Sequence, residues 1–380
     1  MGRILPFTNE HEMFRKAVRD FFQAEVEPYY NQWEKDGIVP RELFKKMGDL
    51  GYLCVWADEK YGGAGADFLY SCILVEENHL CGANAVFVGL HSDIVGPYLN
   101  TFANEEQKER WLPGCVSGDL ILAVAMTEPH AGSDLAAIRT RAIKDGDHYV
   151  LNGSKTFISN GLLGDIFLVA VKTDPEAGHR GVSLVVVERD TPGFTRSKPI
   201  PKIGLHSQDT VELYFEDCRV PTKNLLGEEG KGFIYLMQKL QQERLIAAHM
   251  NVATAQRCFN LTMEYIQQRQ AFGKPLSKFQ NTQFVMAEIA TEIELARNSV
   301  DKLILDHMKN ENIIKEVSMM KYWVGDMVNR TASRCLQLFG GYGFCEEYEI
   351  SRHYCDTRIQ SIFGGTSEIM KMIIAKELGM

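Results

Sequence analysis

Three stretches of sequence decide the fold: Ile166-Phe-Leu-Val-Ala-Val171, Val182-Ser-Leu-Val-Val-Val187 and Val211-Glu-Leu-Tyr-Phe215. Each is a short apolar run bounded by turn residues, which predicts strands spaced as in a small β-sandwich or barrel. Outside this region, residues 7 to 120 and the chain beyond residue 230 carry apolar side chains at helical spacing. The order along the chain is therefore helical, then β, then helical.

This order predicts an α+β fold of three domains, which a length of 380 residues accommodates. The sequence texture changes near Leu122 and again after Gly227-Glu-Glu-Gly230. We predict a helical N-terminal domain at 1–121, a central β-domain at 122–230 and a C-terminal helical bundle at 231–380. Within the bundle, residues 283 to 308 and 312 to 338 are expected to form long helices.

The composition excludes several classes of function. Lys and Arg number 41 against 50 Asp and Glu, a net charge of −9, whereas a nonspecific nucleic-acid binder is expected to be basic. No apolar run reaches the roughly 18 residues of a membrane-spanning helix. Nine cysteines, an odd number without a CxxC pair, fit neither a zinc site nor a disulfide framework. We expect a cytoplasmic, metal-free protein that binds neither nucleic acid nor membrane.

The first segment that could carry chemistry is Ala125-Met-Thr-Glu-Pro-His-Ala-Gly-Ser-Asp134. Its Thr, Gly and Ser residues lie among predicted strands and make a loop rich in backbone N–H groups and hydroxyls. Such a loop can hold a polar ring or a phosphate. A plain turn in which Asp134 caps a short helix explains the same composition. The residues alone leave both interpretations open.

Three further segments lie in the helical C-terminal part. Gln268-Arg-Gln-Ala-Phe-Gly-Lys-Pro-Leu-Ser-Lys-Phe-Gln280 connects two helices, the first ending at Gly273, and its cations suit a pyrophosphate. Gln337-Leu-Phe-Gly-Gly-Tyr-Gly-Phe344 places three glycines after a helix, where a ligand can approach closely. Ser361-Ile-Phe-Gly-Gly-Thr-Ser-Glu-Ile369 begins a helix at the N-cap pair Thr366 and Ser367, and helix N-termini bind anions. The respective alternatives are a solvated loop, a helix C-cap and a helix start without ligand.

In this order and spacing, the four segments resemble the hallmark motifs of the flavin-dependent acyl-CoA dehydrogenase family over essentially the whole chain. The resemblance implies the three-domain fold described above, with a C-terminal four-helix bundle. It also implies FAD as cofactor, an acyl-CoA substrate, electron-transfer flavoprotein as electron acceptor and a homotetramer. Members of the family remove the α-proton of a thioester while a hydride leaves Cβ for the flavin, which gives a 2,3-enoyl-CoA.

The resemblance also assigns roles to single residues. Positions that contact the flavin ring and phosphates, or pack beside the ring, are matched by Met126, Thr127, Ser133, Phe157, Ile158, Ser159, Thr366 and Glu368. Positions that reach FAD from a neighbouring subunit are matched by Arg269, Phe272, Gln337 and Gly341. Gly132 and Gln280, from the same motifs, complete the predicted FAD contacts. Ser133 and Arg244 match substrate-binding positions, Arg244 near the CoA moiety, although an ion pair within the protein is the alternative for Arg244. Phe279 departs from the pattern, since some members have His there.

The position of the catalytic base departs from many members of the family. They carry it as a Glu at the position of Gly364, which has no side chain. A second group, the long-chain and isovaleryl-CoA dehydrogenases, carries the base on the first long helix of the C-terminal domain. The run Gln242-Glu-Arg-Leu245 is similar to the pattern of that group. The resemblance therefore implies Glu243 as the base.

Periodicity supports the same residue. Leu236, Leu240, Glu243 and Ala247 fall on one helix face, so Glu243 lies on an apolar stripe. Partial burial there is expected to raise the pKa of its carboxyl. The alternative is a surface carboxylate paired with Lys239 or Arg244.

A second carboxylate lies in the run from Ala85 to Tyr98, which is apolar except for His91, Ser92 and Asp93. The resemblance places this run beside the acyl pocket, where related dehydrogenases have small or apolar residues, and an unused charge there is costly. Asp93 could cap a helix and face away, or bind a polar group and limit acyl length. It could also be a second or replacement base for an alicyclic acyl-CoA of the cyclohexane- or cyclohexene-carboxyl type.

Two other functions fit the same sequence. One is a flavin oxidase, which would differ in its reaction with oxygen. The other is a catalytically silent acyl-CoA-binding protein. The missing side chain at Gly364 supports this function, and the presence of Glu243 argues against it. The leading expectation is an acyl-CoA dehydrogenase.

Overall fold

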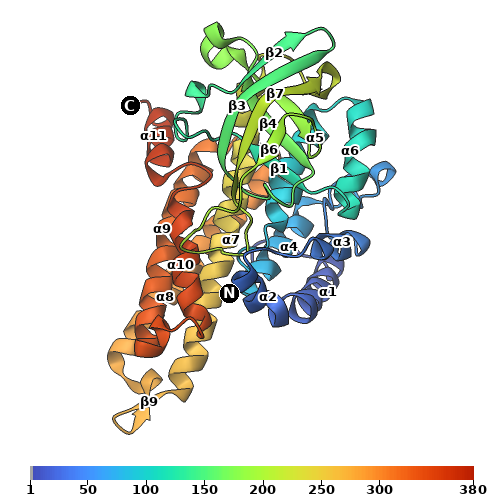
Figure 1. Cartoon of the computed structure of the whole chain (residues 1–380). Helices are drawn as coiled ribbons and strands as arrows, with labels where there is room; N and C mark the ends of the chain where they lie inside the picture. Colours follow the sequence, from blue (N-terminus) through green and yellow to red (C-terminus); the bar gives the residue numbers. More distant parts are fainter. Residues whose placement is uncertain (1–2) are drawn as a thin grey trace.

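The computed structural model describes residues 3 to 380, so residues 1 and 2 of the predicted N-terminal domain lie outside the described residues. Helices pack below a β-domain, and long helices run the length of the molecule (Figure 1). The N-terminal helices are α1 (Asn9–Glu25), α2 (Glu27–Asp36), α3 (Arg41–Asp49), α4 (Phe68–Leu80), α5 (Gly96–Phe102) and α6 (Glu105–Ser117). A π-helix at Leu90–Val95, hereafter the π-turn, leads directly into α5.

The β-domain contains one eight-stranded sheet. Its strands are β1 (Leu122–Ala125), β2 (Arg141–Asp145), β3 (His148–Ile158), β4 (Ile166–Lys172), β5 (Val182–Glu188), β6 (Phe194–Arg196), β7 (Val211–Pro221) and β8 (Leu225–Leu226). The order is β6-β7-β3-β2-β4-β5-β8, and β1 pairs with β4 in parallel. The strands predicted from the three apolar runs are therefore present, in one mixed sheet.

The two most apolar strands, β4 and β5, are buried on both faces. Residues Ile166, Leu168 and Ala170 of β4 pack in a cluster with Leu99 of α5 and Leu112 of α6. The alternate residues of β4 pack instead in the interior of the β-domain. A continuous apolar run rather than an alternating one is expected of a strand covered on both sides. These strands therefore fasten the β-domain to the N-terminal helices.

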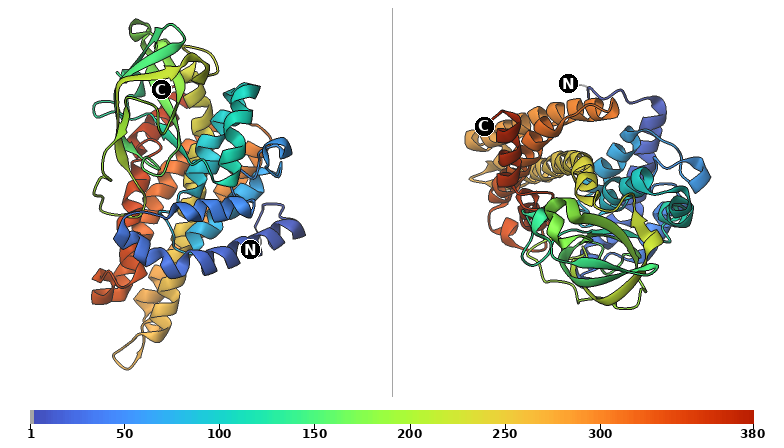
Figure 2. Two further views of the ribbon diagram at one scale, coloured as in Figure 1. Left: turned by 45° about the vertical axis from the view of Figure 1, so that its right-hand side comes forward. Right: turned by 90° about the horizontal axis from the view of Figure 1, so that it is seen from above.

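The C-terminal part consists of helices around one central helix. Its elements are α7 (Gly232–Gln268), β9 (Gln270–Ala271), β10 (Lys274–Pro275), α8 (Gln280–Met308), α9 (Ile314–Phe339), α10 (Glu349–Asp356) and α11 (Ser367–Glu377). Seen from above, α7 lies between the N-terminal helices and the remaining C-terminal helices (Figure 2). Because α7 is enclosed from both sides, side chains on either face of it are buried. No helix within residues 3–380 is both long and apolar enough to cross a membrane.

One local prediction is wrong. The first long helix was expected to end at Gly273, but α7 ends at Gln268 and residues 270–275 form the small hairpin β9–β10. Phe272 and Gly273 both have positive φ, 51° and 79°, as a two-residue hairpin turn requires. A right-handed helix cannot pass through two such residues, which is why it stops earlier.

Candidate active site

Glu243 lies on the apolar stripe of α7 where the sequence places it. Leu236, Leu240 and Ala247 on the same stripe are buried. Glu243 forms no ion pair with any described residue; Lys239 instead donates a hydrogen bond to Thr101, Nζ to Oγ1 at 2.6 Å. The surface pairing that the sequence left open is therefore not formed.

The carboxylate of Glu243 borders the space that a side chain at Gly364 would enter. A Cβ atom built on Gly364 would lie 3.5 Å from Oε1 of Glu243 and 3.8 Å from Cε of Lys321. Gly364 itself has a positive φ of 62° in the turn before α11. Two residues that are distant in the chain, and that the resemblance links as alternative carriers of the base, thus meet at one point.

Polar side chains around this point have buried atoms without a hydrogen-bond partner among the described residues. They are Oε2 of Glu243, Nε of Arg244 and the hydroxyl of Tyr98 on α5. Burial raises the pKa of Glu243, and the positive charges of Arg244 and Lys321 offset part of this rise. The result is a carboxylate whose proton affinity is increased, as a general base near neutral pH requires.

Lys321 on α9 and Tyr98 were not predicted from the sequence. Lys321 is fully buried and donates a hydrogen bond from Nζ to the carbonyl oxygen of Gly365. The signal that could have found it is its spacing from Val317, Val324 and Val328, which puts a cation on the apolar face of α9. Tyr98 gave no signal, because a tyrosine within an apolar run is ordinary core composition.

Asp93 lies inside the π-turn and is 2% exposed, so it does not cap a helix and face away. Its Oδ1 has no hydrogen-bond partner among the described residues, and burial raises its pKa to about 7. The backbone carbonyl of Asp93 accepts a hydrogen bond from Nε2 of Gln242, the neighbour of Glu243, at 2.7 Å. The neighbouring His91 has a structural role, since its two ring nitrogens bond Leu122 N and Cys115 O.

The predicted flavin-binding segments of the β-domain lie side by side. The N–H of Thr156 donates to the carbonyl oxygen of Thr127 at 3.0 Å, which joins the loop after β1 to the end of β3. Below this joint, Nζ of Lys155 bonds both the carbonyl oxygen of Met126 at 3.1 Å and Oε1 of Glu128 at 2.7 Å. Lys155 and Glu128 are both buried, and sequence reasoning assigned neither a role.

The side chains at this joint differ in what they can offer a cofactor. Phe157 is 64% exposed and has a positive φ of 58°, so its ring stands out from the sheet. Ile158 points into the interior of the β-domain, which leaves only its backbone for a flavin. The hydroxyls of Thr127, Ser133 and Ser159 make no hydrogen bond within the described chain and lie at least partly exposed. An exposed aromatic ring beside free neutral donors fits a flavin and its phosphates.

Two further predicted FAD residues, Thr366 and Glu368, lie at the start of α11. Thr366 is the N-cap of α11 and its hydroxyl accepts from the N–H of Ile369, so Ser367 is the first helical residue and not part of a cap pair. Glu368 is exposed, and hydrogen bonds from its own backbone and from Thr366 lower its pKa. Asp134, considered as a helix cap, makes no side-chain capping bond to the short 3-10 helix that follows it.

The remaining predicted FAD residues lie elsewhere. Arg269, Gln337 and Gly341 line a groove of about 590 Å³ at the far end of α7 and α9. Phe272, at the tip of the hairpin, is 96% exposed, and Gln280 is also exposed. The hairpin lies at the opposite end of the molecule from the β-domain (Figure 1). These five residues therefore cannot touch the same cofactor as Thr127 of their own chain.

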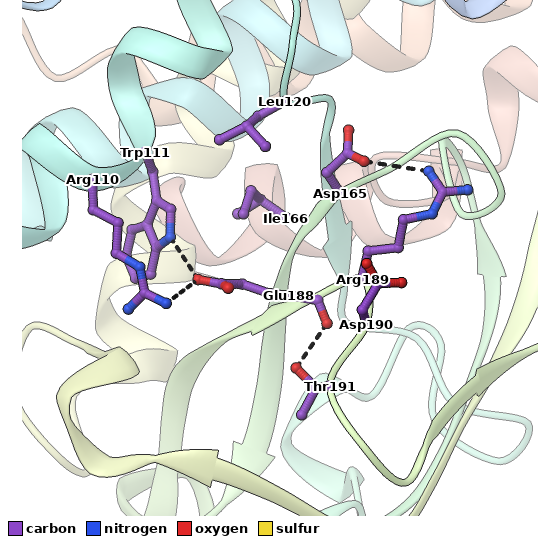
Figure 3. A pocket seen from close by; sticks show the side chains of 9 residues that line it. All are labelled: Arg110, Trp111, Leu120, Asp165, Ile166, Glu188, Arg189, Asp190 and Thr191. Atoms are coloured by element: carbon purple, nitrogen blue, oxygen red, sulfur yellow. Dashed lines mark hydrogen bonds and ion pairs between the residues drawn. The ribbon is translucent and has the colours of Figure 1, made fainter.

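A polar cleft of about 430 Å³ lies between α6 and the ends of β4 and β5 (Figure 3). Its charges largely pair with one another: Arg110 and Trp111 both bond Glu188, and Arg189 bonds Asp165. None of the predicted site residues lines it. The candidate active site is therefore the region around Glu243, Gly364 and the Thr127 joint.

Comparison with known proteins identifies the family. Models of the acyl-CoA dehydrogenase N-terminal, middle and C-terminal domains match residues 8–119, 123–218 and 230–379. The chain belongs to the acyl-CoA dehydrogenase family. Members of this family are FAD flavoproteins and oxidoreductases that act on a CH–CH group. The expected fold, cofactor and class of enzyme are confirmed.

Individual relatives share the whole length of the chain. The long-chain specific acyl-CoA dehydrogenase of Sus scrofa mitochondria is 46% identical over 98% of this chain and 87% of its own. The crystal structure of an acyl-CoA dehydrogenase from Geobacillus kaustophilus is 55% identical, covers 100% of both chains and superposes with a TM-score of 0.98. A structure described as the electron transferring flavoprotein of Acidaminococcus fermentans is 33% identical over 98% of each chain, with a TM-score of 0.95.

Proposed function

We propose that this acyl-CoA dehydrogenase oxidises an acyl-CoA thioester between Cα and Cβ to the 2,3-enoyl-CoA, with Glu243 as the base that removes the α-proton. The observation that carries this assignment is that Oε1 of Glu243 lies 3.5 Å from the position where a side chain at Gly364 would begin. It supports Glu243 because its carboxylate, carried by α7, borders the space that a side chain at position 364 would enter.

The residues around Glu243 serve this step in different ways. Burial favours the neutral carboxyl, so Glu243 can accept a proton and retain it. Arg244 and Lys321 keep the carboxylate sufficiently ionised to act before the substrate loses its proton. FAD, when bound beside Thr127, Ser133 and Phe157, supplies the acceptor for the β-hydride.

Reduction of the bound flavin tests the assignment directly. Holoenzyme without oxygen is mixed with a panel of acyl-CoA thioesters, and loss of the visible flavin absorbance is followed. We expect Glu243→Gln to slow bleaching by about 10² to 10⁴-fold, the range typical of a lost general base. Glu264→Gln, an exposed carboxylate on the same helix, is the matched control.

Full activity of Glu243→Gln on every accepted thioester would contradict the base assignment. No bleaching of the wild-type protein by any thioester would favour the silent acyl-CoA-binding protein instead. Rapid return of the absorbance in air would indicate an oxidase.

A second candidate substrate class follows from Asp93. Its burial, its Oδ1 without a hydrogen-bond partner among the described residues and a pKa of about 7 are properties that a second base would need. On this proposal the substrate is an alicyclic acyl-CoA of the cyclohexane- or cyclohexene-carboxyl type. Asp93→Asn would then spare straight-chain thioesters and abolish turnover of the cyclic one. Equal activity of the variant on both classes would refute it.

The assembly and electron acceptor are further parts of the proposal. The separation of the predicted FAD residues between two ends of the chain supports a homotetramer in which the hairpin of one subunit reaches the cofactor of another. Similarity to the Acidaminococcus fermentans structure supports electron-transfer flavoprotein as the electron acceptor. The nine cysteines, which fit no disulfide framework, support a cytoplasmic location. Light scattering of the holoenzyme and reduction of purified electron-transfer flavoprotein test the first two.

A further inference from the structure

Lys321 is an ammonium group in an enclosed site without an ion-pair partner. None of its side chain is exposed, and no carboxylate among the described residues comes within ion-pair distance of Nζ. Within residues 3–380, its one hydrogen-bond acceptor is the carbonyl oxygen of Gly365. Burying a charge without an ion-pair partner costs free energy. The residues one turn before and after Lys321 on the same face of α9, Val317 and Val324, are apolar. An apolar residue would satisfy the packing of α9, so packing alone does not account for a lysine here.

The contacts of Lys321 point to the candidate base. Its Cε lies 3.8 Å, and Oε1 of Glu243 lies 3.5 Å, from the same point above Gly364. Gly364 and Gly365 both have positive φ, 62° and 97°, a backbone conformation that glycine adopts readily. The hydrogen bond from Nζ of Lys321 to the carbonyl oxygen of Gly365 ties this turn to α9, next to Glu243.

We propose that Lys321 is a positioning residue for the dehydrogenation: it fixes the glycine turn against Glu243 and supplies the positive charge that keeps the base ionised. This inference rests on the proposed function, since it takes Glu243 to be the base. Lys321 acts on the reaction through Glu243 and through the turn, without contact to the reacting carbons.

The charged groups around Glu243 and Lys321 determine whether removing the charge of Lys321 raises or lowers the pKa of Glu243. Glu243 faces Arg244 on its own helix, Lys321 from α9 and the Tyr98 hydroxyl from α5. Lys321 in turn is influenced by Asp326 on α9 and by Glu368 on α11. A nearby cation lowers the pKa of a carboxyl, so removing the charge of Lys321 raises the pKa of Glu243. The base then becomes ionised only at higher pH.

Two substitutions separate the charge from the hydrogen bond. Lys321→Gln keeps a donor for Gly365 without charge, and Lys321→Arg keeps the charge. The rate of flavin reduction by an accepted acyl-CoA is measured across pH for each holoenzyme. We expect the acidic limb of the profile to move up by about one pH unit in Lys321→Gln, and to stay near the wild-type position in Lys321→Arg. Lys315→Gln removes a charge from an outer position of the same helix and should leave the limb in place.

The outcomes distinguish this proposal from the proposed function. If Glu243→Gln is inactive but Lys321→Gln keeps the wild-type limb, the base assignment stands and the role of Lys321 is overturned. If Glu243→Gln remains active, both proposals fall. A change in melting temperature without movement of the limb would show that Lys321 is a packing residue only, and would equally overturn the proposal.

Discussion

The buried ion pair of Lys155 and Glu128, next to the hydrogen bond between Thr156 and Thr127, gives the sharpest stability prediction. Lys155 bonds Glu128 at 2.7 Å and the carbonyl oxygen of Met126 at 3.1 Å, and neither charged side chain is more than 2% exposed. Glu128 also accepts the backbone N–H groups of Arg139 and Thr140, at 2.7 and 2.9 Å. The perturbation is Lys155→Met, which keeps the length of the side chain and removes its charge.

The cost follows from what the substitution leaves behind. Breaking a buried pair by removing one partner costs about 3 to 5 kcal/mol, because the remaining charge is buried unpaired. Since Glu128 keeps two backbone donors, we expect the lower end, about 3 kcal/mol. For a cooperative unit of about 150 to 250 residues, such a loss lowers the melting temperature by roughly 6 to 12 °C.

Two further variants check the explanation. Adding Glu128→Gln to Lys155→Met removes the unpaired charge and should restore at least about 1 kcal/mol. Lys144→Met, an exposed lysine on β2, should change stability by less than about 0.5 kcal/mol. Because Lys155 also holds the backbone of Met126, we expect Lys155→Met to retain less FAD after gel filtration.

The assay is thermal unfolding of holoenzyme and of protein stripped of flavin, together with the flavin-to-protein absorbance ratio. A fall in melting temperature no larger than that of Lys144→Met would refute the reasoning. A double variant less stable than Lys155→Met would show that the loss arises from something other than the stranded carboxylate.

Three further predictions concern other parts of the molecule. Gly364→Ala should lower the free energy of unfolding in urea by about 1 kcal/mol, the cost of a left-handed backbone for alanine. The added methyl would lie at an ordinary distance of 3.5 Å from Glu243 and should add no clash. A loss of stability above about 3 kcal/mol would contradict this explanation. Burial raises the pKa of Glu76, but nearby positive charges, led by that of Arg3, together outweigh this effect and lower the pKa to about 2. Ionised Glu76 therefore stabilises the fold above its ordinary pKa of 4.5, and this stabilisation is lost as the pH falls toward 2. The stability gap to Glu76→Gln should therefore be roughly 3 kcal/mol at neutral pH and close in acid, and a constant gap would exclude the mechanism. Phe272→Ala, at a 96% exposed position, should leave the subunit fold unchanged but weaken assembly or FAD retention in light scattering and flavin analysis; unchanged assembly and flavin content would argue against its intersubunit role.

Much of the fold could be predicted because apolar spacing reports burial locally. The runs that begin at Ile166 and Val182 became strands covered on both faces, and Glu243 lies on the stripe that its spacing indicates. The failure at Gly273 has a local cause as well. A Phe-Gly turn with two positive φ angles ends the regular helix several residues before the glycine that was taken to end it.

The sequence by itself determined the helical, β, helical order, the motifs of the family and a carboxylate on an apolar face of α7. The tertiary structure alone decided that Glu243 lies beside Gly364, that Lys321 bonds the carbonyl oxygen of Gly365 and that Lys155 stays buried beside Glu128. The physical reason is that periodicity shows which face of an element is buried but not which other face covers it. That pairing depends on how α7, α9 and the sheet pack, and it determines the charges that surround the candidate base.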